Sequence, residues 1–567
     1  MKTKLIACTS TALLIASAAY PATIRTGAVF ASNSTGGAVN ISTTGDLDGG
    51  DLSIGFSTSN GALEVNASST PNPVTAITNI DDLRIGAQTA TGSLAVIGNG
   101  TAGSAKIEAQ DDFRLGANAD SSLSIENGGE IIYTSRPAGR SGTVIIGSFA
   151  DFISGTGNTT TTVTGPNSYF EINGRLELGF TNGLGSDDMT VSNGARVVVK
   201  EPDDFATRVA DTSDPTESTT GVVSIGGDFS FGTAQALDTL TVTGAGSELV
   251  FSSSFFTNSG NNRIVVSDGG AIRQNETGDI EASAAFFGRD PDAFFGISLG
   301  SAVGQSSVLV DGAASTMSAT RNISIGAGDV FVGFENPEEF TGPLFGPSTA
   351  DITVSNGALL STTKDIVVSV KDETGTGFLT VESGGRVEAS KVLVNDGGVL
   401  SGDGGTIAAD VILDGGTIAP GASPGTMTID GNLEVLDGLL SLEVGGTGPG
   451  MFDQLFVSGD LITPVGLSIA ITFLDGFLPQ IGDSFDFLNV EGSAAIFGTP
   501  EEISVSILGI DPANFNLTIG ENGFSGTVTG GDPTVPVPLP AGLPLLLTAL
   551  GAVGLVSRRR QSGAAKP

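Results

Sequence analysis

Two short phrases of apolar and polar residues recur along the chain and alternate with each other. In the first phrase, apolar residues enclose one variable residue and precede a glycine, as in residues 83–86 (LRIG) and 297–300 (ISLG). In the second, an apolar residue is followed by a polar residue and a polar-glycine pair, as in residues 191–194 (VSNG). Alternation of apolar and polar residues has the period of a β-strand with one buried face, so both phrases predict short strands ended by turns.

Further copies of both phrases extend over most of the chain. The first phrase also ends at Gly116, Gly179, Gly226 and Gly326, and the second at Gly128, Gly269, Gly357, Gly384 and Gly397. Glycine and Asn-Gly or Asp-Gly pairs supply the positive-φ corners that a coiled chain needs. Self-similarity without a rigid period indicates a solenoid with insertions between some coils.

We therefore expect an all-β protein whose residues 19–435 form a right-handed parallel β-helix, with Val, Ile, Leu and Phe stacked inside it. An ordinary β-sandwich is the alternative, and the repeated glycine corners favour the solenoid. From about residue 436 to residue 525 the rhythm loosens, which predicts a β-rich cap that closes an otherwise open edge. Six phenylalanines fall in its strand-like segments: Phe452, Phe456, Phe473, Phe477, Phe485 and Phe487. Residues 526–536 have the composition of a flexible linker.

The first 18 residues have the pattern of a secretory signal peptide. Lys2 and Lys4 precede a short apolar stretch, and Ala16 and Ala18 form a small-residue cleavage site before Ala19. The apolar stretch is too short for the roughly 20 residues of a membrane-spanning helix. We expect the Sec-type export machinery and signal peptidase to act on this segment.

The C-terminal part has three consecutive elements between residues 537 and 560. A short motif, Val537-Pro538-Leu539-Pro540-Ala541, precedes an apolar stretch, which is followed by Arg558, Arg559 and Arg560. Cationic residues after an apolar helix hold that end in the cytoplasm, so residues 561–567 would be a cytoplasmic tail. The pattern predicts a hydrophobic helix that lies in the inner membrane at least transiently.

This arrangement resembles the VPLPA variant of the PEP-CTERM sorting signals of Gram-negative bacteria. The resemblance implies that an exosortase-type transpeptidase recognises the motif and sends the protein to the cell surface or the extracellular matrix, with Arg558–Arg560 as the stop signal. An ordinary C-terminal membrane anchor is the alternative. The signal peptide agrees with this interpretation, because a sorting substrate must first be exported.

The repeats themselves resemble those of autotransporter passengers and of PEP-CTERM proteins. Residues 401–407 (SGDGGTI), 415–421 (GGTIAPG), 423–426 (SPGT) and 429–433 (IDGNL) follow the terminal phrase of such passengers, and residues 442–446 and 453–455 also fit. An autotransporter would continue into a β-barrel of about 8 or more strands. Here a sorting tail follows instead, so we expect a chain that does not translocate itself.

Composition narrows the chemistry further. The 567 residues include 83 glycines and no histidine, and the single cysteine, Cys8, lies in the signal peptide. Catalytic triads with histidine, His-ligated zinc, disulfides and cysteine nucleophiles are therefore excluded for the mature chain. The formal charge of −38 has the wrong sign for binding nucleic acid.

The acidic residues raise two further functional possibilities, carbohydrate chemistry and calcium binding. Adjacent acids such as Asp81-Asp82, Asp111-Asp112, Asp187-Asp188, Asp203-Asp204 and Glu338-Glu339 could serve a carbohydrate-active enzyme. Neighbours on a strand point to opposite faces, however, so we interpret them as solvated charges and expect no enzyme. Asp268, Asp396 and Asp414, at glycine corners, are the candidates for Ca²⁺, but the tandem calcium nonapeptide is missing and we expect no cofactor beyond diffuse divalent binding.

The sequence thus predicts an exported, non-enzymatic, acidic β-solenoid. The family resemblance adds an association with biofilm or exopolysaccharide. An adhesin is the alternative, with its binding patch in an insertion such as residues 200–220 or 280–296, and a polysaccharide lyase or glycoside hydrolase is the third possibility.

Overall fold

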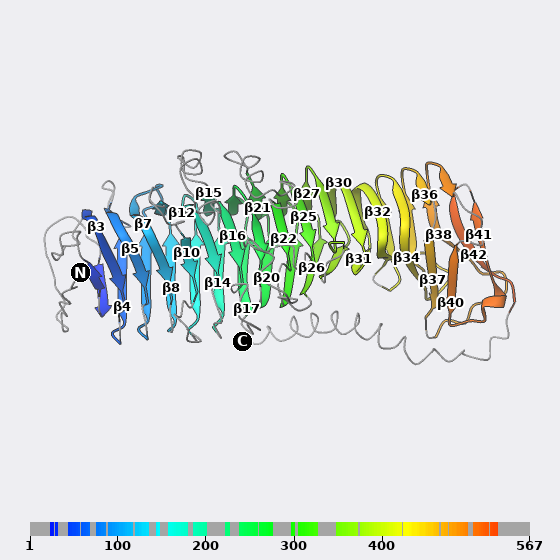
Figure 1. The fold of residues 1–567 in the computed structure, drawn as a ribbon, viewed down its shortest axis with the longest axis horizontal. Helices are drawn as coiled ribbons and strands as arrows, with labels where there is room; N and C mark the ends of the chain where they lie inside the picture. Colours follow the sequence, from blue (N-terminus) through cyan, green and yellow to red (C-terminus); the bar gives the residue numbers. More distant parts are fainter. Residues whose placement is uncertain are drawn as a thin grey trace, which may run out of the picture.

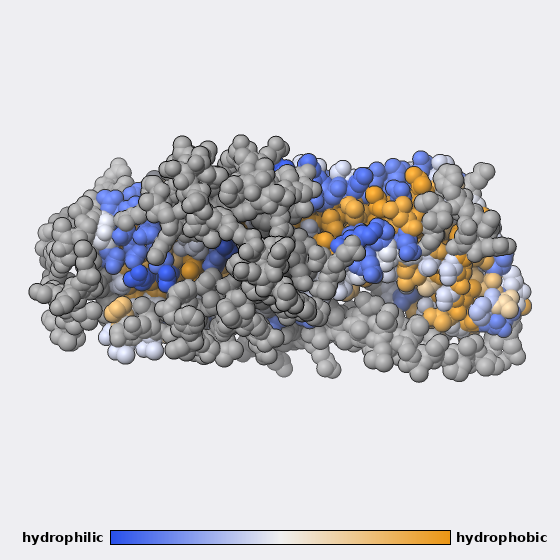
Figure 2. Space-filling view, viewed as in Figure 1, coloured by the Kyte–Doolittle hydropathy of each residue, from blue (hydrophilic) through white to orange (hydrophobic). Residues whose placement is uncertain are grey.

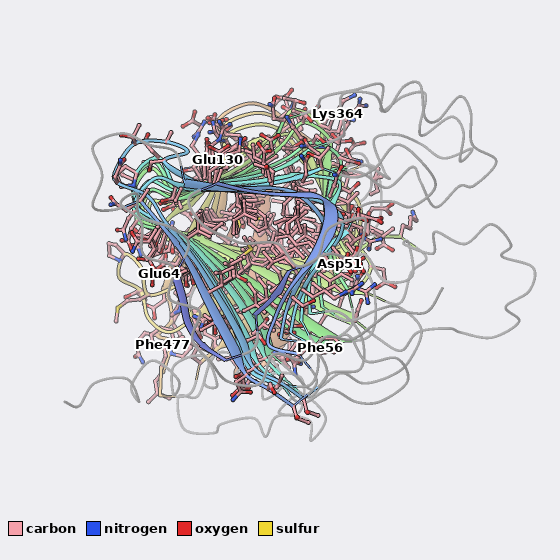
Figure 3. All side chains as sticks on the ribbon, turned by 90° about the vertical axis from the view of Figure 1, so that its left-hand side faces the viewer. Asp51, Phe56, Glu64, Glu130, Lys364 and Phe477 are labelled. Carbon is pink, nitrogen blue, oxygen red and sulfur yellow. The ribbon has the colours of Figure 1, made fainter. Side chains whose placement is uncertain are left out.

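The computed structural model is a long rod of stacked β-strands (Figure 1). Strands pair in parallel with the strands one coil earlier and one coil later, as β14 (Asp187–Ser192) does with β11 (Thr159–Thr164) and β17 (Leu237–Thr243). Viewed from the N-terminal end, the coils enclose a three-sided section filled with side chains (Figure 3). The expected parallel solenoid is confirmed, and its right-handed sense stays a prediction.

The structure describes the following residues: 23–27, 29–31, 44–56, 58–67, 75–86, 89–116, 119–134, 143–147, 157–179, 185–200, 221–226, 237–258, 260–275, 296–300, 304–326, 348–371, 375–421, 423–463, 467–474, 476–496, 503–520 and 522–530.

Three faces follow from the strand pairing. The first face contains β11, β14 and β17 together with β4 (Gly61–Asn66), β6 (Gly92–Ile97), β8 (Ser121–Glu126), β20 (Gly260–Ser267), β23 (Gly304–Asp311), β26 (Ser348–Ser355), β29 (Thr376–Val381), β31 (Gly398–Gly402), β37 (Leu467–Phe473) and β40 (Ser504–Leu508). The second face contains β9 (Gly129–Thr134), β12 (Tyr169–Asn173), β15 (Arg196–Lys200), β18 (Glu248–Phe251), β21 (Ala271–Gln274), β24 (Thr316–Ala319), β27 (Leu359–Thr362), β33 (Thr426–Ile429), β35 (Gln454–Val457) and β38 (Ser484–Val490).

The third face contains β10 (Thr143–Ile146), β13 (Arg175–Leu178), β16 (Val222–Ile225), β19 (Phe255–Thr257), β22 (Gly296–Leu299), β25 (Asn322–Ile325), β28 (Asp365–Val368), β36 (Leu461–Thr463) and β39 (Ala494–Ile496). Six long strands bend around corners and contribute to more than one face: β3 (Thr44–Ile54), β5 (Thr75–Ile85), β7 (Ala105–Leu115), β30 (Arg386–Asn395), β32 (Gly405–Pro420) and β34 (Leu433–Val444).

The core is built from inward-facing residues that occupy the same position in successive coils. On the first face one such row is almost entirely valine: Val96, Ile125, Val163, Val191, Val242, Val266, Val310, Val354 and Val381, all fully buried. Each such side chain contributes about 1.5–3 kcal/mol by leaving water. The second phrase of the sequence supplies this row, which confirms that its copies stack.

The two glycine phrases form two different corners. At the end of the third face, Gly86 and Gly179 have φ values of +72° and +79°. At the end of the first face, Asn127 and Gly128 have φ values of +52° and +85°. The predicted positive-φ corners are therefore confirmed. Gly397 belongs to the second phrase but does not lie at the end of the first face. The strand before it stacks on the third face.

Coils differ in length, as the irregular spacing of the phrases predicts. Val399 pairs with Thr417 in the next coil, whereas Asp188 pairs with Thr239, with residues 201–220 between them. Strand pairing keeps the same register on both sides of these residues. A longer coil therefore keeps its place in the stack.

Antiparallel strands pair with the outermost coil at both ends of the rod. At the N-terminal end β1 (Thr23–Gly27) pairs with β4, and β2 (Val29–Ala31) pairs with β3. At the C-terminal end β42 (Gly523–Val528) pairs with both β38 and β41 (Phe515–Gly520), which follows a short 3-10 helix, η4 (Pro512–Asn514).

The range 436–525, for which the sequence predicts a β-rich cap, is built mainly of strands. Parallel pairing continues beyond residue 435 as far as β40, and antiparallel pairing involves only strands between Ser484 and Val528. Larger, aromatic side chains fill these last coils and weaken the short Val-and-Gly phrases, which is why the rhythm loosens before the coil ends.

Candidate functional site

The outer surface of the second face carries most of the ion pairs, and they link successive coils. Glu248 lies between Arg196 and Arg273 of the neighbouring coils, with 2.6 Å from Arg196 Nε to Glu248 Oε1. Lys200 Nζ lies 3.0 Å from Glu171 Oε1. Each such surface pair stabilises the fold by only about 0–1 kcal/mol. Their main effect is that the basic residues of this face are already neutralised.

An acidic row lies near the N-terminal end of the third face. Asp82 and Asp112 occupy paired positions in β5 and β7, and Arg84 NH2 lies 2.5 Å from Asp82 and 3.7 Å from Asp112. Asp51, in the preceding coil, acts on Asp82 from the same side of the rod, where it is labelled in Figure 3. In Figure 2 this end of the visible face is polar.

Burial raises the pKa of Asp82 to about 6. Arg84 opposes this shift, and the negative charges of Asp51, Asp112 and Asp111 add to it. A carboxyl group with a pKa near neutrality has the property that general acid catalysis requires. The raised pKa alone does not define a reaction, because structural carboxyl clusters show the same shift.

Aromatic platforms for sugar rings do not accompany this row. Tyr133 is fully buried, and its hydroxyl donates a hydrogen bond to the backbone carbonyl of Asp111. Tyr169 is half-buried, with its hydroxyl 2.6 Å from Glu171 Oε2. Tyr133 therefore presents no ring face to the surface, whereas Tyr169 lies on the outer side of β12 with its hydroxyl bonded to Glu171.

Sequence adjacency is a poor guide to which acids meet. Asp187 points inward and Asp188 outward, as the alternation of a strand predicts. The interpretation of these acids as solvated charges is therefore wrong for Asp187, which is buried. Acids come together instead across coils, as Asp82 does with Asp112. The pairs at residues 203–204 and 338–339 lie outside the described residues.

The three predicted calcium candidates do not form one site. Asp268 lies at a corner after the first face and accepts a hydrogen bond from Thr243, 3.2 Å away. Asp396 and Asp414 lie in neighbouring coils at another corner, and Asp414 forms an ion pair with Lys371 at 2.6 Å. In the part of the chain that the structure describes, no group of three or more acidic, Cys or His residues is arranged to hold a metal ion.

A row of polar residues inside the rod is a feature that sequence reasoning missed. It follows the first position of the first face through successive coils: Ser121, Thr159, Asp187, Asp238, Asn262 and Ser306. All six side chains are buried. The signal was present in the sequence, because each residue precedes a stacked Val or Ile by four positions.

An apolar row lies on the outer surface of the third face. Val367, Leu393 and Ile412 pair through successive coils, point away from the core and are half-exposed. Figure 2 shows apolar side chains on this part of the rod, toward its C-terminal end. The continuous apolar runs at residues 366–368 and 392–394 are the sequence signal for strands that are apolar on both faces.

The targeting segments and the proposed adhesin insertions fall beyond what the structure describes. Residues 1–18 and 537–567 are outside the described residues, and so are residues 201–220 and 280–295 of the insertions. Within the described ranges, no helix is long and apolar enough to span a membrane. The predicted signal peptide, sorting motif and membrane helix therefore stay predictions.

Comparisons of the chain with known protein families and curated proteins identified no relative. No family model matches the chain, and no curated protein is significantly similar to it. The fold and surface described above therefore define the chain as a β-solenoid protein, and its function rests on the arguments that follow.

Proposed function

We propose that the protein is an exported structural rod of the cell surface or extracellular matrix, sorted through its C-terminal VPLPA-type segment. The observation that carries this proposal is the single uninterrupted stack of coils, with antiparallel strands added to the outermost coil at each end. Such strands cover part of each open edge, which limits edge-to-edge pairing while the rod presents three long faces. Its coil is right-handed, the sense that parallel strand crossovers favour.

The surface charge supports a role among extracellular polymers. The chain has 62 acidic and 24 basic residues, and the ion pairs of the second face use several of those bases. The remaining acidic excess keeps the rod soluble and repels anionic polysaccharide. Divalent cations bridge the two, which gives the matrix a reversible crosslink.

Export and sorting are tested on the mature C-terminus. The wild-type chain is compared with a motif variant, Pro538→Ala with Pro540→Ala, and with a matched linker control, Pro533→Ala with Pro536→Ala. Cells are fractionated, and the C-terminal peptide of each form is identified by mass spectrometry. We expect the wild type and the linker control to end at the motif and to leave the inner membrane.

The motif variant should keep its full C-terminus and remain with the inner membrane. Surface-exposed wild-type protein that still carries Arg558–Arg560 would contradict the sorting proposal. Small-angle scattering of the mature protein tests the rod separately, since a compact particle would contradict the structural role whatever the outcome of sorting.

A further inference from the structure

A lysine, an asparagine and a glutamate meet on the outer side of the second face. Asn173 of β12 and Lys200 of β15 occupy paired positions in successive coils. Glu171 lies two residues before Asn173, on the same side of its strand. Neighbouring strands are about 4.7–4.9 Å apart, so the three side chains start from adjacent points of one surface.

One carboxylate oxygen contacts both nitrogen atoms of this group. Lys200 Nζ lies 3.0 Å from Glu171 Oε1, and Asn173 Nδ2 donates a hydrogen bond to the same oxygen at 3.0 Å. The amine and the amide nitrogen are therefore at most twice that distance apart. The hydroxyl of Tyr169 donates to Glu171 Oε2 at 2.6 Å and so holds the other oxygen of the carboxylate in place.

Water has little access to these side chains. Asn173 is 8% exposed, and the side chain of Glu171 is 16% exposed. The residues that pair with Glu171 in the two neighbouring strands, Ile132 and Val198, are aliphatic, and Val198 is buried although it points outward. An apolar surround disfavours charged groups, so it lowers the cost of moving a proton from a lysine ammonium to a carboxylate.

Glu171 is placed to act as a general base. Burial acts to raise its pKa, but hydrogen bonds from Tyr169, Lys200 and Asn173 outweigh burial and hold the pKa below its usual range. The group is therefore an ionised carboxylate within hydrogen-bond reach of the proton that it would accept. A neutral lysine amine is a nucleophile, and the flexible stem of Lys200 lets Nζ move from the carboxylate to the amide carbon.

We propose that Lys200 and Asn173 join in an isopeptide bond that links successive coils of the rod. The lysine ammonium loses one proton to Glu171, and the resulting amine attacks Asn173 Cγ. The bond from Cγ to Nδ2 then breaks, with its electron pair on the leaving nitrogen. Two protons of the lysine ammonium end on that nitrogen, which departs as ammonium, so that Nζ keeps one hydrogen in the new amide. The reaction needs no oxidant and no other reactant.

The bond would turn one complete coil into a covalent ring. Between Asn173 and Lys200 the chain passes through β13 on the third face and β14 on the first face before it returns to the second. A covalent link of this kind restricts the unfolded chain and so stabilises the folded one. Because it acts within the rod, it does not depend on how the protein is sorted.

One competing reaction would also release ammonia. Asn173 precedes Gly174, and an asparagine in such a pair can cyclise onto the next backbone nitrogen. In this structure the N–H of Gly174 donates to the backbone carbonyl of Lys200 at 3.0 Å. That hydrogen bond holds the backbone nitrogen in the strand pairing, so the fold favours attack by the lysine.

The test uses the mature chain, purified from whichever cell fraction holds it, and two site variants. Lys200→Arg keeps the positive charge beside Glu171 but removes the nucleophile, and Glu171→Gln keeps the shape but removes the base. The matched control is Lys106→Arg, because Lys106 lies 2.8 Å from Glu108 and 3.6 Å from Glu130 but pairs with no asparagine. Each protein is denatured, cleaved with trypsin and analysed by mass spectrometry.

The wild type and the control should yield peptide 141–175 joined to peptide 197–208, with no cleavage after Lys200. The mass of the joined peptides should be that of the two together less one ammonia. Lys200→Arg and Glu171→Gln should yield peptide 141–175 unlinked and at its full mass. Lys200→Arg should also melt at a lower temperature than the wild type, since it keeps the ion pair but lacks the link.

The proposal is overturned if the wild type is cleaved completely after Lys200 and peptide 141–175 has its full mass. It is also overturned if peptide 141–175 loses ammonia without being joined to another peptide, because that result shows cyclisation at Asn173. Linkage in Glu171→Gln at the level of the wild type would overturn the role assigned to the carboxylate.

Discussion

Phe485 holds the C-terminal cap together, and its replacement by alanine tests whether the rod loosens locally. Phe485 is fully buried, with its ring centroid 5.4 Å from that of Phe452, 5.9 Å from Phe473 and 5.8 Å from Phe487. It lies on β38, the strand on which the antiparallel β42 pairs. Loss of this ring therefore leaves a cavity in the aromatic cluster through which the last coils contact Phe515 of the cap.

The expected loss of stability follows from the burial of the ring. Substitution of a buried Phe by Ala costs about 3–5 kcal/mol, because the cavity is not refilled. Each 1.4 kcal/mol is tenfold in an equilibrium constant, so local opening should become roughly 100- to 4,000-fold more frequent. In a solenoid each coil contacts only its neighbours, so the increase should be confined to the cap.

Hydrogen exchange followed by mass spectrometry measures this opening along the chain. Peptides from residues 484–528 should lose protection in Phe485→Ala, while peptides from β20 and β23 stay protected. The reciprocal control is Phe113→Ala, whose buried ring packs between Tyr133 and Phe170 with centroids 6.3 Å and 5.8 Å away. That variant should loosen the N-terminal coils and leave the cap intact.

Two results would refute this reasoning. Equal loss of protection in the cap and in the central coils would mean that the rod unfolds as one cooperative unit. A loss of less than tenfold in the cap would mean that the antiparallel strands hold without the aromatic cluster.

Three other perturbations have defined outcomes. In denaturant unfolding, Gly402→Ala should destabilise the rod by about 1–3 kcal/mol more than the control Gly476→Ala. A Cβ atom on Gly402 would lie 2.0 Å from the carbonyl oxygen of Val381, whereas a Cβ atom on Gly476 would have no atom within 4 Å. Equal losses of stability in the two variants would contradict this. Burial raises the pKa of Asp82 from 3.8 to about 6, so the folded state holds an extra proton between these values and its stability should fall as the pH rises from about 4 to about 6. Melting temperatures of the wild type and of Asp82→Asn, measured over this pH range, test this fall in stability. A wild type that gains stability relative to the variant as the pH rises would disprove the prediction. Glu248→Gln should change the free energy of unfolding by less than about 1 kcal/mol despite the two arginines beside it, because the pairs are near the surface; a loss above 2 kcal/mol would show a buried network instead.

Local signals predicted much of the architecture. The alternation in residues 187–192 correctly predicts that Asp187 and Asp188 point to opposite sides of the strand, although Asp187 was expected to be solvated and is buried. Asn193 and Gly194 correctly mark a corner, with φ values of +56° and +80°. These features depend on only a few consecutive residues, so the sequence contains them in full.

The candidate sites were harder to predict, because their members come from different coils. Asp187 meets Asp238 of the next coil, and Asp82 likewise meets Asp112 through strand pairing. The Ca²⁺ candidates at Asp268 and Asp414 were chosen for local turn chemistry, and the structure separates them.

By itself the sequence determined which residues form strands, which face of each strand is buried and where the chain turns, because period-two alternation and glycine φ preferences are local. Only the tertiary structure decided which residues are neighbours one coil apart. The reason is that coils vary in length, as between Val399–Thr417 and Asp188–Thr239, so lateral register depends on burial and backbone pairing over the whole stack. The buried carboxyl pair at Asp187 and Asp238 is a product of that register.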